Sequence, residues 1–300
     1  MAALNVWYAV PAAKLERIHK VTTLLHNASL MYVCTLYAPY MHWLWHSSRS
    51  ANIINTRLDD IQDGSELRRG KPATHMVFGI GQTINSAGYA VHLALTEISS
   101  WNCPTSMAIF MQEVTQLYIG QGNDLHWTSN LLCPTEEEYW SMNDAKTGGM
   151  FRFFTKLMQI RASQNHDLDI SNLLNNIGRH FQLRDDYLSL GSDEYTATKG
   201  FCEDLDEGKY SLPLIHLIQT LGANDCLLQD MLAQRRVDGK QSLENKHAIL
   251  KMLKEYGSLD YALDVIHDLQ KKIDDEVGRI EKETRVVNSK IRAILQCLNV

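Results

Sequence analysis

The sequence of 300 residues contains few helix breakers, with 17 glycines and 6 prolines. No proline lies in residues 135–212 or after Pro213, and proline is the residue that most strongly disrupts a helix interior. Both stretches can therefore hold long helices. Alternation of apolar and polar residues, which is typical of strands, never extends far enough to predict a sheet.

The six cysteines are scattered and include no Cys-x-x-Cys pair, which argues against a zinc ribbon and a disulfide framework. A reducing compartment suits such a chain, and we expect a cytoplasmic protein. Lys and Arg total 29 against 35 for Asp and Glu, a formal net charge of −6. Because a nucleic-acid binder needs a basic excess to neutralise phosphates, nucleic acid is not expected as a partner.

Long apolar runs are also lacking. The first residues have no basic start followed by an uninterrupted apolar stretch, so no secretory signal is predicted. The most membrane-like stretch, residues 30–45, contains Pro39 and His42 and is shorter than the ~20 apolar residues that a spanning helix needs. We therefore expect no transmembrane segment.

Apolar residues recur at three- and four-residue steps along much of the chain, which is the period of an amphipathic helix. Residues 11–30 show this spacing, and near-heptad spacing after Ser258 predicts a long final helix. Thr135 followed by Glu138 is a capping-box pattern that opens another helix toward Ile160. Further helices are expected over residues 84–100, 105–117, 173–188 and 212–221. The sequence therefore predicts an all-α protein.

An acidic cluster, Asp-Asp-Ile-Gln-Asp, begins at Asp59. On a helix, Asp59 and Asp63 lie on one face, where two carboxylates can jointly hold divalent cations through oxygen. Taken alone, the cluster is equally compatible with a solvated acidic helix face.

A second acidic pair, Asp185-Asp186, follows Gln182 closely in a helical stretch. Ser189 stands where a third acid would complete the pattern of the first cluster. An Asp pair alone carries little information, because one arises easily by chance, and Asp274-Asp275 is interpreted as such a surface pair.

Basic residues accompany the acidic ones. They are Arg68-Arg69 after the first cluster, Lys146 in a Lys-Thr-Gly-Gly run, Lys199 and Lys209. Each could separately be a surface charge, but carboxylates that hold a cation together with groups that bind oxyanions form the set required for a diphosphate ester. His26 is either a core histidine or a further diphosphate contact.

Together these motifs resemble eukaryotic geranylgeranyl diphosphate synthases of the all-α trans-prenyltransferase family. The similarity covers Leu24–Leu30 and, from Leu58, the segments LDDIQDGSELRRGKPATH, GQGNDLHW, CPTEEEYW, AKTGGMF, FQLRDDY and KGFCEDLDEGKYSLP. It implies one domain over residues 1–300, a single large helical bundle around a deep central cavity, of the isoprenoid synthase type.

The resemblance also implies residue roles. The implied magnesium (Mg²⁺) ligands are Asp59, Asp63 and Asp185. The implied contacts of the allylic diphosphate are Arg68, Lys146, Lys199 and Lys209. The implied contacts of isopentenyl diphosphate are His26 and Arg69. The residues implied beside the developing carbocation are Thr147 and Gln182, which form the expected catalytic set with Lys146.

The implied reaction is Mg²⁺-dependent condensation of isopentenyl diphosphate with an allylic diphosphate. Dimethylallyl, geranyl and farnesyl diphosphate are the expected allylic substrates, with farnesyl preferred and geranylgeranyl diphosphate as product. In the family, bulky residues before the first acidic motif shorten the product, and here small Ala28 and Ser29 stand in that region. The family further suggests a homodimer or an assembly of dimers.

Two features depart from the family pattern. Relative to the family the chain is expected to be truncated at its N-terminus, without a Gly-Lys-x-x-Arg motif that helps to bind isopentenyl diphosphate. Residues 32–57, aromatic and then polar, separate two segments that family members join in one helix. We interpret them as an atypical insertion, either a gene-model error such as a translated intron or a genuine loop that touches a membrane surface or partner.

These departures leave a second function open, a catalytically weak or inactive partner subunit of a full-length prenyl diphosphate synthase. A terpene cyclase shares the Asp-rich cluster, but Arg68-Arg69 directly after it and the Lys-Thr-Gly-Gly run argue against that class.

Overall fold

The computed structural model describes residues 1–29, 58–68, 71–191, 201–222 and 226–298. The expected insertion at residues 32–57 lies outside them, as do Arg69 and Lys199. The helices are α1 (Asn5–Tyr8), α2 (Ala12–Ser29), α4 (Leu58–Gln62), α5 (Thr74–Phe78), α6 (Ile80–Ser99), α7 (Pro104–Asn130), α8 (Glu136–Gln159), α9 (Ser171–Gly191), α11 (Glu203–Glu207), α12 (Leu212–Leu221), α13 (Cys226–Asp238), α14 (Leu243–Glu255), α15 (Ser258–Thr284) and α16 (Ser289–Gln296).

The all-α prediction is confirmed. Across the described ranges, β-structure is confined to the antiparallel two-residue strands β1 (Leu67–Arg68) and β2 (Lys71–Pro72), directly after the acidic cluster. None of the helices in the described ranges is long and apolar enough to cross a membrane.

The predicted capping box opens α8. The Thr135 hydroxyl accepts a hydrogen bond from the Glu138 backbone N–H at 3.2 Å, and the Glu138 carboxylate accepts one from the Thr135 N–H at 2.8 Å. Two orphan donors of the helix start are thereby satisfied. Three glutamates in the first turn also complement the positive end of the helix dipole.

Helix α7 is longer than predicted, because the expected helix over residues 105–117 continues to Asn130. Gly120 and Gly122 lie in the continuation, and glycine weakens an isolated helix by roughly 1 kcal/mol relative to alanine. Packing against α8 outweighs this preference, since α7 and α8 form the most extensive helix pair of the bundle.

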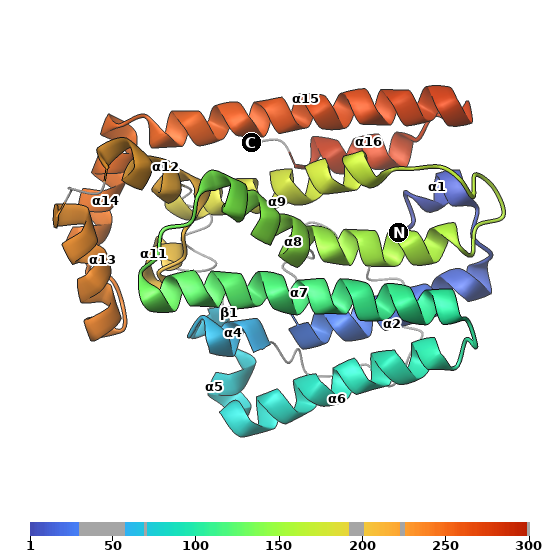
Figure 1. Cartoon of the computed structure of the whole chain (residues 1–300), viewed down its shortest axis with the longest axis horizontal. Coiled ribbons are helices and arrows are strands. Elements are labelled where there is room, and N and C mark those ends of the chain that lie inside the picture. Colours follow the sequence, from blue (N-terminus) through green and yellow to red (C-terminus); the bar gives the residue numbers. More distant parts are fainter. Residues whose placement is uncertain (30–57, 69–70, 192–200, 223–225, 299–300) are drawn as a thin grey trace.

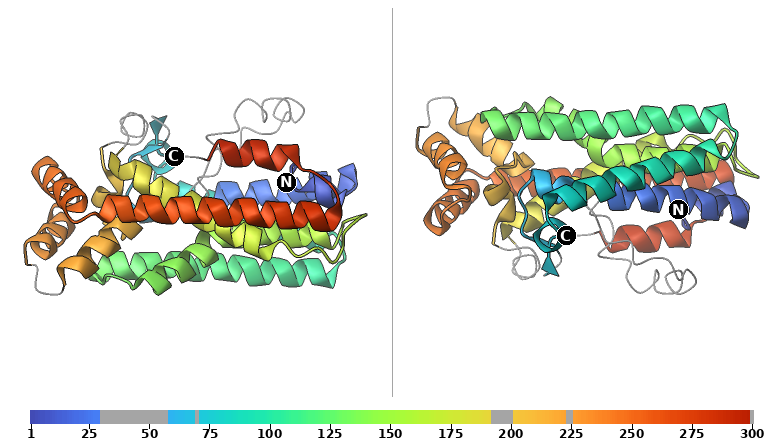
Figure 2. Two further views of the ribbon diagram at one scale, coloured as in Figure 1. Left: turned by 90° about the horizontal axis from the view of Figure 1, so that it is seen from above. Right: turned by 90° about the horizontal axis from the view of Figure 1, so that it is seen from below.

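The long helices α2, α6, α7, α8, α9 and α15 run side by side along the long axis of the molecule (Figure 1). The shorter helices α12, α13 and α14 gather at one end, as both views of Figure 2 show. Helices α4 and α5 approach the bundle near that same end (Figure 1). The bundle thus has a long-helix part and a short-helix part.

Each part has its own apolar core. The first core joins α1, α2, α7 and α16 to the second half of α8 and the first half of α9, with Trp7 and Phe153 among its fully buried side chains. The second core joins α12, α13 and α14 to the first half of α8 and the second half of α9, around Tyr139 and Leu183. Helix α15 contributes to both cores, with Leu269 in the second and Ile273 in the first.

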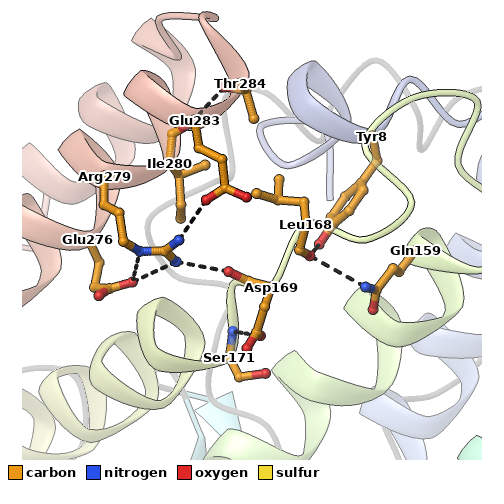
Figure 3. Close-up of polar contacts among 10 residues, drawn as sticks. All are labelled: Tyr8, Gln159, Leu168, Asp169, Ser171, Glu276, Arg279, Ile280, Glu283 and Thr284. Atoms are coloured by element: carbon orange, nitrogen blue, oxygen red, sulfur yellow. Dashed lines mark hydrogen bonds and ion pairs between the residues drawn. The ribbon is translucent and has the colours of Figure 1, made fainter.

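Arg279 ties the end of α15 to the bundle (Figure 3). Its guanidinium bonds Glu276 and Glu283 of the same helix at 2.9 and 2.8 Å and donates to the backbone carbonyl of Asp169, between α8 and α9, at 2.8 Å. The Tyr8 hydroxyl donates to the neighbouring Leu168 carbonyl at 3.1 Å. The chain start, the α8–α9 connection and α15 therefore meet at one place.

Candidate active site

A polar cavity of about 380 Å³ lies among α4, α7, α8, α9, α11 and α13. Its lining includes seven of the residues singled out in the sequence, which are Asp59, Asp63, Lys146, Thr147, Gln182, Asp185 and Lys209. Residues separated by up to 150 positions in the chain are thus brought to one surface. The acidic cluster, α9 and the α11 segment all contribute carboxylates to the lining.

The cavity lies where one apolar core ends and the other begins. On α8, Lys146 and Thr147 fall between Met142 of the second core and Met150 of the first. On α9 the same change of core takes place close to Gln182. Polar side chains can face inward at this junction because neither apolar core of the described residues fills it, and burying them inside either core would cost several kcal/mol each.

Two glycines bring the backbones of α7, α8 and α9 together at the junction. A Cβ on Gly120 of α7 would lie 2.8 Å from the backbone nitrogen of Lys146, and a Cβ on Gly178 of α9 would lie 3.3 Å from the Cα of Gly148. Any larger residue at Gly120 would have to push the helices apart. These crossings explain why Lys146 and Thr147 can reach both neighbouring helices.

Lys146 stands between carboxylates of two helices. Its ammonium lies 2.9 Å from Asp124 Oδ2 on α7 and 3.6 Å from Asp59 Oδ1 on α4. Burial opposes the charge of Lys146, but Asp124, Asp59 and Asp63 outweigh burial and raise its pKa above the ordinary value. Burial would raise the pKa of Asp124, yet Lys146 and Lys209 hold it below its usual value. Lys146 and Asp124 therefore both keep their charges at neutral pH.

The acidic cluster forms a helical turn, as predicted, because the Asp63 N–H donates to the Asp59 carbonyl at 2.8 Å. Burial, followed by the charges of Asp59 and Glu207, raises the pKa of Asp63 well above its usual value. Glu207 lies close across the cavity, where its carboxylate accepts a 2.8 Å hydrogen bond from the Ser65 hydroxyl. Burial, followed by the charge of Asp204, raises the pKa of Glu207 to about 8. A bound cation would stabilise the ionised forms of Asp63 and Glu207.

A hydrogen-bonded chain crosses from α8 to α9. The Thr147 hydroxyl donates to Gln182 Oε1 at 3.1 Å, and Gln182 Nε2 donates to Asp186 Oδ1 at 2.8 Å. Asp186 also accepts from the Tyr139 hydroxyl at 2.7 Å and from Lys209 at 3.0 Å. The second Asp of the acidic pair is therefore fully enclosed by donors, whereas Asp185 faces the cavity.

The structure adds residues that the sequence did not single out. They are Tyr139, Asp124, Asp204, Glu207, Arg235 and Arg236. Asp124 lies in the GQGNDLHW segment and Asp204 and Glu207 in the KGFCEDLDEGKYSLP segment. Isolated carboxylates on helices have no local signature, so only their location in these segments could have indicated them.

Other predicted residues are not placed on this cavity. His26 is half-buried in the last turn of α2, and the described cavity lining does not include it. For Arg68 the structure describes the backbone in β1. Arg69 and Lys199 lie outside the described residues. The diphosphate contacts assigned to these four residues stay predictions.

Comparison with known proteins indicates the family to which the chain belongs. Residues 56–252 match the family model described as polyprenyl synthetase, which is well over half of the chain. A bifunctional type I diterpene synthase of Aspergillus flavipes is 44% identical over 99% of this chain and 35% of its own length. A bifunctional sesterterpene synthase of Aspergillus aculeatus is 44% identical over 99% of the chain and 38% of its own length.

An ophiobolin F synthase of Cochliobolus heterostrophus is 42% identical over 99% of the chain and 39% of its own length. The chain thus spans well under half the length of these curated relatives. The match to the family model covers the acidic cluster, the Lys-Thr-Gly-Gly run and the second acidic pair together. The chain belongs to the polyprenyl synthetase family, whose members carry out prenyl transfer.

Proposed function

We propose that this chain condenses isopentenyl diphosphate with an allylic diphosphate in a Mg²⁺-dependent prenyl transfer, with farnesyl diphosphate as the preferred allylic substrate and geranylgeranyl diphosphate as product. The observation that carries the proposal is one cavity whose lining holds Asp59, Asp63 and Asp185 together with Lys146 and Lys209. Neither an acidic nor a basic surface alone would bind a diphosphate together with its metal ions.

The donor set fits magnesium bound together with substrate. Among the described residues, no group of three acidic, histidine or cysteine side chains forms a ready-made metal site. Proteins usually bind Mg²⁺ through one or two carboxylates plus substrate phosphates, and carboxylates from separate helices around one cavity suit that arrangement. Asp204 Oδ2 is buried and has no hydrogen-bond donor among the described residues, and the same holds for Asp59 Oδ1 apart from its 3.6 Å contact with the Lys146 ammonium. Both oxygens could therefore accept a further contact from a cation.

Asp59, Asp63 and Asp185 would hold the ions, which supply positive charge that stabilises the departing diphosphate. Lys146 and Lys209 would bind its oxygens, and their charges are already oriented by Asp124 and Asp186 before substrate arrives. Such preorganised charge lowers a barrier without reorganisation during the reaction. The Thr147–Gln182 pair would lie beside the allylic carbon, where oriented dipoles can stabilise the cation that forms on ionisation.

The double bond of isopentenyl diphosphate would attack that cation, and the proton lost afterwards would pass to the departing diphosphate. No side chain of the cavity needs to form a covalent bond to substrate. Catalysis would therefore be electrostatic, which matches a cavity that carries charged groups at neutral pH and no activated nucleophile among the lining residues described.

The relatives favour a role within a larger protein. Two of them are named bifunctional diterpene and sesterterpene synthases, and the chain corresponds to little more than a third of each. We infer that it is the prenyl-transfer unit of such a protein and supplies the linear precursor that another unit converts. Geranylgeranyl diphosphate would serve a diterpene product, and its next longer homologue a sesterterpene product.

The test is to incubate the purified chain with Mg²⁺, farnesyl diphosphate and labelled isopentenyl diphosphate, and to identify the products by chain length. We expect label in geranylgeranyl diphosphate and none in a reaction containing a chelator. Label that stays in isopentenyl diphosphate would contradict the proposal. Label that moves into the next longer product would retain prenyl transfer and correct the product.

A further inference from the structure

Asp186 differs from its neighbour Asp185 in its surroundings. The side chain of Asp186 is fully buried, and it is not among the residues that line the described cavity. Asp185 is half-buried and lines it. Two consecutive carboxylates on one helix therefore face different environments, and only one of them reaches the place where a diphosphate would bind.

Three donors from three elements converge on Asp186. Gln182 Nε2 and Lys209 Nζ donate to Oδ1 at 2.8 and 3.0 Å, and the Tyr139 hydroxyl donates to Oδ2 at 2.7 Å. These bonds join α8, α9 and the turn after α11. A buried carboxylate with three donors, one of them charged, is well compensated for its loss of water.

The carboxylate also determines which way the Gln182 amide points. An ionised carboxylate only accepts hydrogen bonds, so the NH₂ group of Gln182 must face Asp186. The amide oxygen then faces Thr147, whose hydroxyl donates to it at 3.1 Å. The position of Lys209 is fixed by the same Oδ1 atom. Two groups that face the cavity are thus oriented from behind by one side chain.

We propose that Asp186 is a positioning residue, which orients the Gln182 amide and the Lys209 ammonium toward the substrate, and that it does not bind Mg²⁺. The inference rests on the proposed prenyl transfer for its effect on rate. The two aspartates of the second pair would thus have different roles: Asp185 would bind the metal ion, and Asp186 would hold Gln182 and Lys209 in position.

The test compares Asp186→Asn with Asp185→Asn and with Asp275→Asn, an exposed aspartate on α15 that serves as a matched control. Binding of Mn²⁺ at saturating inorganic pyrophosphate is followed by electron paramagnetic resonance, and kcat by labelled isopentenyl diphosphate. We expect Asp186→Asn to lower kcat by at least about 10-fold, since preorganised donors typically contribute 10²-fold or more. Its Mn²⁺ affinity should stay within about threefold, whereas Asp185→Asn loses about 10-fold or more.

A double-mutant cycle separates positioning from a general loss of structure. If Asp186 acts through Gln182 and Lys209, the kcat loss of Asp186→Asn should be smaller in a Gln182→Ala background than in the wild type, because coupled residues are not additive. The part of the loss that acts through Lys209 should remain. Fully additive losses would overturn the proposal. So would a Mn²⁺ affinity of Asp186→Asn that falls as far as that of Asp185→Asn.

Tyr139→Phe covers the case in which Asp186→Asn does not fold. It removes one hydrogen bond and leaves the carboxylate with Gln182 and Lys209, so it should fold and lower kcat about 2- to 10-fold with unchanged Mn²⁺ affinity. Wild-type kcat in Tyr139→Phe would count against the proposal. If the wild-type chain transfers no prenyl group, the proposed function fails, and the Mn²⁺ titration still decides whether Asp186 is a metal ligand.

Discussion

The two apolar cores of the bundle are built differently. The first packs long helices with large rings, including an edge-to-face pair of Phe110 and Phe153 with centroids 5.9 Å apart. The second packs the short helices α12, α13 and α14 against the ends of α8 and α9. Charged residues gather between them, where neither core continues. Stability and chemistry are therefore separated along the same helices, and substitutions in each region should affect different measurements.

The largest effect is expected at the junction, from Asp59→Ala. Loss of this carboxylate removes one ligand of the proposed metal site, and we expect kcat to fall at least about 1,000-fold, or about 4 kcal/mol of transition-state stabilisation. The melting temperature should change little, because the loss of the 3.6 Å contact with Lys146 is offset by relief of the repulsion between Asp59 and Asp63. Asp275→Ala is the exposed control. Near-normal turnover of Asp59→Ala would contradict the site assignment.

The opposite outcome is expected in the first core. Phe153 is fully buried and contacts Phe110, so Phe153→Ala should lower the free energy of unfolding by about 3 to 4 kcal/mol. Phe153→Leu, which leaves a smaller cavity, should cost less than half of that. Denaturant unfolding measures both, and kcat per folded molecule should be close to wild type at a temperature where both fold. If kcat per folded molecule falls in Phe153→Ala, the first core affects catalysis as well as stability, and the two regions are not independent.

The stability of the fold is expected to depend on pH through His180, a buried residue of α9. His180 is fully buried, and neither ring nitrogen has a hydrogen-bond partner among the described residues. Burial, followed by the charge of Arg184, lowers its pKa to about 4, against an opposing effect of Asp274 on α15. The unfolded chain, with a histidine pKa of about 6.5, therefore takes up a proton that the folded chain does not.

Between pH 6.5 and 4 the unfolded state binds more protons at this site, so stability is lost as pH falls through that range. The loss amounts to at most about 3 kcal/mol at pH 4. His180→Leu should flatten this part of the stability profile measured by denaturant unfolding, while the exposed His247, replaced by Leu, should leave it unchanged. A profile equally steep in His180→Leu would show that other groups cause the loss.

The smallest effect is expected from Arg279→Ala at the end of α15. Arg279 is partly exposed and its partners are a surface network, so the cost should be under about 1 kcal/mol. Arg279→Lys keeps the charge but loses the bidentate geometry, and it should recover only part of the loss. Thermal unfolding measures both variants. A cost above about 2 kcal/mol would mean that the contact with Asp169 stabilises the first core more than a surface bond can.

The fold could be predicted where local signals agree with tertiary packing. Thr135 and Glu138 identify the start of α8 because a capping box acts within four residues, and the near-heptad spacing after Ser258 corresponds to the buried face of α15. The end of α7 could not be predicted, since Gly120 is unfavourable locally and is explained only by the approach of α8. Short helices such as α13 and α14 show too few periodic positions to stand out.

The candidate site divides in the same way. Asp59, Asp63 and Asp185 could be singled out because they lie in short motifs, and the structure brings them to one cavity. Asp124 and Glu207 could not, because their significance lies in distances to Lys146 and Ser65, which are remote in sequence. Equally, nothing in the Asp185-Asp186 dipeptide shows that its members face different surroundings. Three-dimensional neighbours, rather than chain neighbours, distinguish them.

The glycine crossings have a consequence for how such proteins diversify. Gly120 and Gly178 set the spacing of three helices at the charged junction through close contacts with backbone atoms and with the Cβ of Ala145, none of which belongs to the first core. Large and small residues can therefore be exchanged far from those crossings. Under the proposed function, such exchanges would change the room for the hydrocarbon tail of the substrate while the reacting groups keep their mutual distances. Substitutions in the apolar core could in this way change the length of the prenyl product between related proteins, while the residues that carry out the reaction stay the same.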